Sequence, residues 1–188
     1  MLLEYYLFNI NSLSEEQTKK CLSLMTEQRK EYLERLSNKK RKQQTVAAEW
    51  LAKTTVAGLL SLKTEDIIIE RDKKGKPFVK DRDIHISISH SGDFVALAVD
   101  TKPVGIDIEV IRPLDLSVAK KVCNDSDNIL LNSSGSKERL NTFFKIWTAK
   151  EAYFKKKGTG ITDMKSVSYK ETGAVHYFTE NLIITVVN

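Results

Sequence analysis

Residues 105–109 read Gly105-Ile106-Asp107-Ile108-Glu109, a stretch in which apolar and acidic side chains alternate. An alternation with a period of two is typical of a β-strand, because successive side chains of a strand point to opposite faces. The two isoleucines are therefore expected on one face and the two carboxylates on the other, about 7 Å apart along the strand. Two such carboxylates can share a hard cation such as Mg²⁺, although two solvated acids on any half-exposed strand give the same alternation.

The sequence before this strand predicts helices followed by a β-hairpin. Ser14-Glu15-Glu16-Gln17 has the form of a capping box, which marks the start of a helix. Isoleucines alternate with serine and histidine over 84–89, which is again a strand pattern. The expected elements are a strand at 2–10, a helix from Ser14 to about 36, a basic connection at 37–42, a helix at 43–62, a short β-branched run at 67–69, a turn-rich loop at 72–77 and a hairpin at 84–99.

The sequence after Pro103 predicts a second set of similar elements. These are a strand at 104–111, a short helix at 117–122, a mobile loop rich in Asn, Ser and Asp at 124–137, an amphipathic helix at 141–157 ended by Gly158, and strands near 167–169, 174–178 and 182–187. Each part has a strand, then helices, then strands. This order favours an α+β protein of two halves, residues 1–102 and 103–188, joined near Pro103.

The composition bounds the class of protein. The chain has 188 residues, and its 30 Lys+Arg against 25 Asp+Glu give a net charge of +5. This balance suits an anionic partner, but an ordinary cytosolic protein with extra lysines shows it too. The two cysteines, Cys21 and Cys123, form neither a disulfide framework nor a zinc motif. No stretch reaches the ~20 apolar residues of a membrane span, and no signal-peptide pattern is visible, so we expect a cytoplasmic protein.

A second candidate motif lies on the predicted helix at 141–157. Trp147, Glu151 and Lys155 follow one another at i,i+4 positions and therefore share a helix face. A carboxylate on that face could act as a metal ligand or a base, and an ammonium could bind phosphate. An exposed glutamate–lysine pair worth about 0.3–0.5 kcal/mol is the simpler reading of the same spacing.

Two further motifs are weaker. His90 lies among serines at the end of a predicted strand, but no Gly-x-Ser-x-Gly elbow is present and the three histidines have no zinc spacing. Gly75-Lys76-Pro77 holds a lysine between a flexible and a rigid residue, where it could contact an anion or simply form a turn.

In their order along the chain, Gly75-Lys76-Pro77, residues 87–91, 105–109 and 147–155 resemble the 4′-phosphopantetheinyl transferase superfamily, specifically its monomeric Sfp-type. The similarity runs from about residue 28 to residue 161. It implies a pseudo-dimer of two similar α+β halves with coenzyme A bound between them. It also implies transfer of the phosphopantetheine arm of coenzyme A to a serine of an acyl or peptidyl carrier protein, with release of adenosine 3′,5′-bisphosphate.

The resemblance also implies roles for particular residues. Asp107, Glu109 and Glu151 match the Mg²⁺ ligands, and Glu151, or a water beside it, would take the proton of the carrier serine. Lys155 matches a lysine on the pyrophosphate. The remaining matches to coenzyme A contacts are Lys76, Pro77, Ser89 and His90. Carrier proteins of this family are typically acidic, which suits the basic balance of the chain; a monomer without nucleic-acid or membrane partners is implied.

The chain departs from the family at the site of the 3′-phosphate. Gln28, Glu31 and Gln44 occupy positions that are usually basic, so we expect Arg41 or Lys42 to contribute part of the binding of this phosphate, with Arg29, Lys30 and His90 as the other candidates. The alternatives are that the phosphate is held only weakly and that the basic run at 37–42 is a solvated connection. Two other functions stay open on the residues alone. The chain could be a different Mg²⁺-dependent enzyme of nucleotide phosphates, or a catalytically silent module that binds an acidic protein or a nucleotide.

Overall fold

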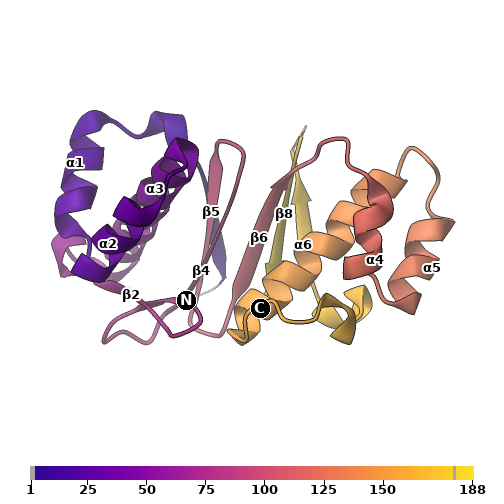
Figure 1. Ribbon diagram of the computed structural model, residues 1–188. Helices are drawn as coiled ribbons and strands as arrows, with labels where there is room; N and C mark the ends of the chain where they lie inside the picture. Colours follow the sequence, from indigo (N-terminus) through magenta and orange to yellow (C-terminus); the bar gives the residue numbers. More distant parts are fainter. Residues whose placement is uncertain (1–2, 180) are drawn as a thin grey trace.

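The structure is a computed structural model that describes residues 3–179 and 181–188. It has two lobes whose small antiparallel sheets face each other in the middle, with the helices on the outer sides (Figure 1). The expected strand at 2–10 is present as β1 (Glu4–Asn9), and its first expected residue lies outside the described residues. The coarse expectation of a mixed helix and sheet protein is confirmed.

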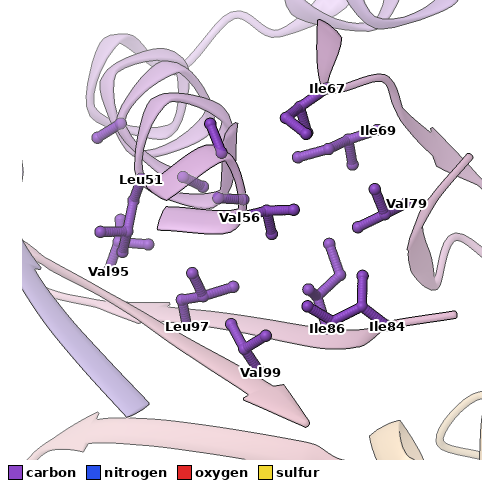
Figure 2. Close-up of a cluster of buried hydrophobic side chains, with 14 of the residues drawn as sticks. Leu51, Val56, Ile67, Ile69, Val79, Ile84, Ile86, Val95, Leu97 and Val99 are labelled. Atoms are coloured by element: carbon purple, nitrogen blue, oxygen red, sulfur yellow. The ribbon is translucent and has the colours of Figure 1, made fainter. Parts of the chain in front are cut away.

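The N-terminal lobe packs a long helix against a three-stranded sheet. The strands are ordered β1–β5–β4, with β4 at His85–Ser91 and β5 at Phe94–Asp100. The helices are α1 (Glu15–Leu24), α2 (Glu27–Arg35) and α3 (Lys39–Leu60). Side chains alternate along β5, so Val95, Leu97 and Val99 enter the core beneath α3 (Figure 2). A separate hairpin of β2 (Ile69–Arg71) and β3 (Pro77–Val79) completes the lobe.

The C-terminal lobe has the same order of elements. Its sheet runs β6–β8–β7, with β6 at Gly105–Val110, β7 at Val175–Phe178 and β8 at Leu182–Val187. Its helices are α4 (Ala119–Val122), α5 (Asp125–Ser133) and α6 (Arg139–Lys157). In both lobes the first strand pairs antiparallel with the last, and the last pairs with the one before it.

The two lobes share a core and a seam. Ala96 and Ala98 of β5 pack against Ile106 and Ile108 of β6, so the isoleucines of the acidic motif face the other sheet. Between β4 and β6, serine side chains make the hydrogen bonds that backbone carbonyl groups would make in a continuous sheet. The hydroxyls of Ser87 and Ser91 accept hydrogen bonds from the backbone N–H groups of Ile106 and Val110 over 3.0 and 3.1 Å. The contacts move from Ser87 to Ser91 on β4 as they move from Ile106 to Val110 on β6, so the two strands run parallel.

Four expectations about the elements are wrong. The single helix from Ser14 to 36 is two helices, because Met25 is extended and Thr26 caps a new start. The connection at 37–42 is largely the first turn of α3, whose N-cap is Asn38. The expected mobile loop at 124–137 contains α5, which begins at a capping box of Asn124 and Asp127; these residues are typical of loops and of helix N-caps alike. The expected strand near 167–169 is replaced by 3₁₀ turns at Met164–Ser166 and Tyr169–Thr172.

Candidate active site

The strand motif at 105–109 and the helix motif at 147–155 meet where α6 packs across β6. Lys155 on α6 donates a hydrogen bond from Nζ to Oδ1 of Asp107 over 2.6 Å and lies 3.9 Å from Oε2 of Glu151. The same ammonium donates to the hydroxyl of Ser89 on β4 over 2.9 Å, and Ser89 donates to Asp107 over 2.7 Å. One lysine thus joins a strand from each lobe to the helix.

The local sequence explains this meeting. Trp147, Glu151 and Lys155 stack at i,i+4 positions, and the indole N–H of Trp147 donates to Oε1 of Glu151 over 2.6 Å. β6 approaches α6 closely at Gly105, where a Cβ atom would lie 1.8 Å from the carbonyl oxygen of Ala152. A residue without Cβ is therefore required, and it brings the acidic face of β6 within reach of the helix.

The carboxylates of this site lie largely away from water, which disfavours their charged forms. Burial and the nearby Asp107 carboxylate raise the pKa of Glu151 to about 7, against the opposing effect of the Lys155 ammonium. Burial also raises the pKa of Glu109, although its Oε2 accepts a hydrogen bond of 2.7 Å from Ser91. Glu151 is therefore a group that can exchange a proton near neutral pH.

The fit of these residues to a cation is uneven. Asp107 is 2% exposed, and its buried Oδ2 has no hydrogen-bond partner among the described residues. Carboxylate oxygens are the ligands that Mg²⁺ prefers, so Asp107 and Glu151 fit such an ion. Glu109 points instead to Ser91 and to Arg112, 3.5 Å away. Within 3–179 and 181–188, no group of three or more His, Cys, Asp or Glu side chains forms a ready-made metal site.

A cavity of about 420 Å³ opens beside His90 on the N-terminal lobe. Nη1 of Arg41 lies 2.9 Å from Nδ1 of His90, and burial, with the charges of Arg41 and Lys155, lowers the pKa of His90 to about 4. The imidazole is thus neutral near pH 7, with Nδ1 accepting from the guanidinium. The lining also includes Gln28, Arg29, Gln44, Arg71 and Pro77.

A smaller cavity of about 160 Å³ lies between the lobes and is lined by Lys155, Lys76 and Pro77 among others. Gly75, Pro77 and Ile88 line both cavities, so the two adjoin. The ammonium of Lys76 donates to the carbonyl oxygen of Lys156 over 2.7 Å at the end of α6. The Gly75-Lys76-Pro77 motif is thus a contact between the lobes at the point where the cavities meet.

The structure brings most of the predicted site residues to one region. Asp107, Glu151, Lys155 and Ser89 are in direct contact or within 3.9 Å of Lys155, and the cavities next to them are lined by Lys76, Pro77, His90 and Arg41. Lys42 lines neither of these two cavities.

Sequence reasoning missed two features of this region. One is the set of β4 serines, whose alternation predicted the strand but not their bonds to β6. The other is Arg71, which lines the larger cavity. Arg71 lies in a polar stretch before a loop, and that pattern carries no sign of a site.

Comparisons with known proteins point to one family. A model of the 4′-phosphopantetheinyl transferase superfamily matches residues 103–182, and a model of a 4′-phosphopantetheinyl transferase N-terminal region matches residues 12–102. The chain is 29% identical over 175 residues to the 4′-phosphopantetheinyl transferase Sfp of Bacillus subtilis, covering 91% of this chain and 78% of that protein.

Two more comparisons cover a smaller share of this chain. The chain is 34% identical over 139 residues to the 4′-phosphopantetheinyl transferase gsp of Aneurinibacillus migulanus, covering 74% of this chain and only 58% of that protein. It is also similar to a crystal structure of a holo-(acyl-carrier-protein) synthase from Bacillus anthracis in complex with CoA, with a TM-score of 0.43 and 23% identity over 52% of this chain and 91% of that one.

Proposed function

The chain belongs to the 4′-phosphopantetheinyl transferase superfamily as an Sfp-type member, and we propose that it transfers the 4′-phosphopantetheine arm of coenzyme A to a serine of an apo carrier protein. In this reaction the serine oxygen bonds to the phosphorus that carries the pantetheine arm. The bond from that phosphorus to the oxygen of the adenosine 5′-phosphate breaks, and adenosine 3′,5′-bisphosphate leaves. The serine proton passes to a base.

The observation that carries this proposal is the contact of Lys155 with Asp107 beside Glu151, with Lys155 itself lining the smaller of the two adjoining cavities. A pyrophosphate is anionic and repels an incoming nucleophile, so a fixed ammonium next to it favours attack. Glu151 is the carboxylate beside this ammonium, 3.9 Å from Nζ of Lys155, and would accept the serine proton.

A bound Mg²⁺ would add Lewis acidity and neutralise charge on the pyrophosphate oxygens. Asp107 and Glu151 would hold it, with Glu109 as the third expected ligand. The unpartnered Oδ2 of Asp107 supports this choice. Lys155 would have a different role: it would hold Asp107 in place and present a positive charge toward the smaller cavity.

Coenzyme A would lie across the two lobes. The smaller cavity is lined by Ser87 and Ile88 from one lobe and by Phe154 and Lys155 from the other. The matching order of strands and helices supports a pseudo-dimer of similar halves, residues 1–102 and 103–188, and the two family models divide between residues 102 and 103. Three other residues would contact coenzyme A or hold in place the side chains that contact it: His90, Pro77 and Ser89.

The partner would be an acidic carrier protein, because the net charge of +5 favours such an encounter. A monomer acting in the cytoplasm would suffice for this function. In the described part of the chain, no helix has the length and apolarity to cross a membrane.

The test is incubation with coenzyme A, Mg²⁺ and a panel of apo carriers from fatty-acid, polyketide, non-ribosomal peptide and lysine biosynthesis. Intact-mass measurement should show at least one carrier gaining one phosphopantetheine arm, and a carrier with its acceptor serine replaced by alanine should gain nothing. Binding of coenzyme A without any mass gain would favour the silent binding module. Cleavage of coenzyme A without a modified carrier would favour another enzyme of nucleotide phosphates.

A further inference from the structure

Four side chains of the C-terminal lobe form a chain of hydrogen bonds that ends beside Asp107. Its members, in order, are Tyr169 in the turn at Tyr169–Thr172, His176 on β7, Thr185 on β8 and Thr148 on α6. The bonded atoms are 3.0, 2.8 and 2.6 Å apart. Both threonines are 0% exposed, so their hydroxyl groups depend on partners within the protein.

The inner end of this chain determines the direction of every hydrogen bond in it. The hydroxyl oxygen of Thr148 lies 2.8 Å from the backbone carbonyl oxygen of Phe144. A carbonyl oxygen only accepts, so Thr148 donates its single hydrogen to Phe144. The hydroxyl of Thr185 must then donate to Thr148. Because its own hydrogen is used, Thr185 accepts a hydrogen bond from Nδ1 of His176.

The same reasoning assigns the tautomer of His176. Nδ1 carries the hydrogen, and Nε2 is bare and accepts a hydrogen bond from the hydroxyl of Tyr169. Burial lowers the pKa of His176, so the ring is neutral near pH 7, as this arrangement requires. All four side chains are therefore satisfied by bonds that run in one direction, from Tyr169 to Phe144.

The direction of these bonds matters because Thr185 is the cross-strand partner of Asp107 in the pairing of β6 with β8. Side chains of such partners lie on the same face of a sheet, with Cβ atoms about 4.5–5.5 Å apart. Both side chains face α6, where Thr185 contacts Thr148 and Asp107 contacts Lys155. Oδ2 of Asp107 nevertheless has no hydrogen-bond partner among the described residues. The hydrogen of Thr185 is directed to Thr148 instead.

We propose that Thr148 and His176 are positioning residues that hold the hydroxyl hydrogen of Thr185 away from Asp107, and so keep Oδ2 of Asp107 free to bind a divalent cation. The inference rests on the proposed function, in which Asp107 is a metal ligand. Thr148 accepts the hydrogen, and the N–H of His176 occupies the opposite side of the Thr185 oxygen. A hydrogen bond to the carboxylate from the neighbouring hydroxyl would compete with the cation, so outer hydrogen bonds of this kind set the affinity of a metal site.

The tautomer of His176 is tested by ¹H–¹⁵N NMR of the metal-free protein at pH 7, with the signal assigned from the spectrum of His176→Gln. The ring should show a protonated Nδ1 and an unprotonated Nε2. A protonated Nε2 with a bare Nδ1 would reverse the chain and overturn the inference. This readout involves neither metal nor turnover, and it does not depend on the proposed function.

The consequence for the cation is tested by titration with Mn²⁺, followed by electron paramagnetic resonance, with coenzyme A present and no carrier. Thr148→Val releases the hydrogen of Thr185 toward Asp107 and should weaken Mn²⁺ binding by about 10-fold, as expected for a hydrogen bond to a charged group. Thr148→Val/Thr185→Val removes that hydrogen as well and should bind within about 2-fold of the wild type. Thr142→Val is the matched control on α6, because the Thr142 hydroxyl contacts Ser134 over 2.9 Å. It should bind as the wild type does.

The rescue by a second substitution separates positioning from a structural effect, which would make the double variant at least as weak as the single one. Melting curves check folding. If Thr148→Val does not fold, His176→Phe frees the Thr185 hydroxyl from the other side; it should weaken Mn²⁺ binding, and Thr185→Val should again restore it. Unchanged binding in the single variants, or a loss without rescue, would overturn the inference and leave the proposed function intact. A wild type that binds no Mn²⁺ would overturn the metal site of the proposed function and this role with it.

Discussion

Lys155 on α6 binds one oxygen of Asp107 on β6 over 2.6 Å, while the other oxygen of the same carboxylate is buried and has no hydrogen-bond partner among the described residues. The lysine fixes the carboxylate without using all its acceptor capacity. A buried acceptor left unused is costly unless something binds it, so this oxygen points to a function rather than to stability.

Asp107→Asn should therefore reduce carrier modification by about 100-fold or more while the protein remains folded, because the change removes the charge but keeps the shape. Initial rates at saturating coenzyme A and a melting curve check both parts. Asp83→Asn, an exposed acid, serves as the control. Near-normal turnover at limiting Mg²⁺ would show that Asp107 is no metal ligand. Glu109→Gln should be milder, since Ser91 and Arg112 already engage Glu109.

Gly105→Ala should destabilise the protein by about 3 kcal/mol or more, since the new methyl group would lie 1.8 Å from the carbonyl oxygen of Ala152 and backbone atoms must move. Gly58→Ala is the matched control inside α3, where no described atom lies within 4 Å of the added Cβ. It should stabilise by about 0.5–1 kcal/mol. Urea unfolding of both variants measures these changes, and two equal shifts would contradict the close approach of β6 and α6.

Lys150→Met should cost about 3–5 kcal/mol of folding stability, because it leaves the buried Asp127 carboxylate without its counter-charge. Their side chains are 0% and 2% exposed, and the ammonium also donates to the carbonyl oxygen of Val122 over 2.8 Å. Lys150→Met/Asp127→Asn should recover part of the loss. Unfolding curves that show an unchanged stability for the single variant would mean that this ion pair does not hold α5 against α6.

Burial, with a smaller effect of Lys145, lowers the pKa of His176 to about 4 in the folded protein, below the ordinary value of about 6.5. Between these values the unfolded chain binds more protons, so stability should rise with pH from 4 to 6.5 and fall on acidification. His176→Gln removes this contribution, and its unfolding free energy should depend less on pH over that window. Denaturation series at pH 4.5 and 7 provide the comparison. Identical pH dependence in the two proteins would contradict the assignment.

Local patterns predicted much of the fold, because the physical causes were local. Alternation marked β4 and β6, the capping box at Ser14 marked the start of α1, and Gly158, with a φ of 65°, ends α6 as expected. The helix α5 was missed because Asn, Asp and Ser favour loops and helix caps equally. The end of α1 at Leu24 was missed because the apolar pattern continues past it. Nothing in that pattern indicates that Thr26 caps a second helix.

The candidate site was predictable only in part. Asp107 and Glu109 share a strand face and Glu151 and Lys155 share a helix face, and both facts follow from periodicity. That Lys155 reaches Asp107 depends on packing at Gly105, which a single sequence does not reveal. The position of Arg71, 3.7 Å from Glu49 and in the lining of the larger cavity, depends on β2 and α3 coming together in the fold.

The most direct test of the account measures, in one reaction mixture, the adenosine 3′,5′-bisphosphate released and the carrier serine modified. The account predicts that wild type gives one bisphosphate for each phosphopantetheine arm attached to the carrier, and that Asp107→Asn gives neither at a comparable rate. Bisphosphate released in the absence of a carrier, or equal rates for wild type and Asp107→Asn, would contradict transfer at the Asp107, Glu151 and Lys155 site.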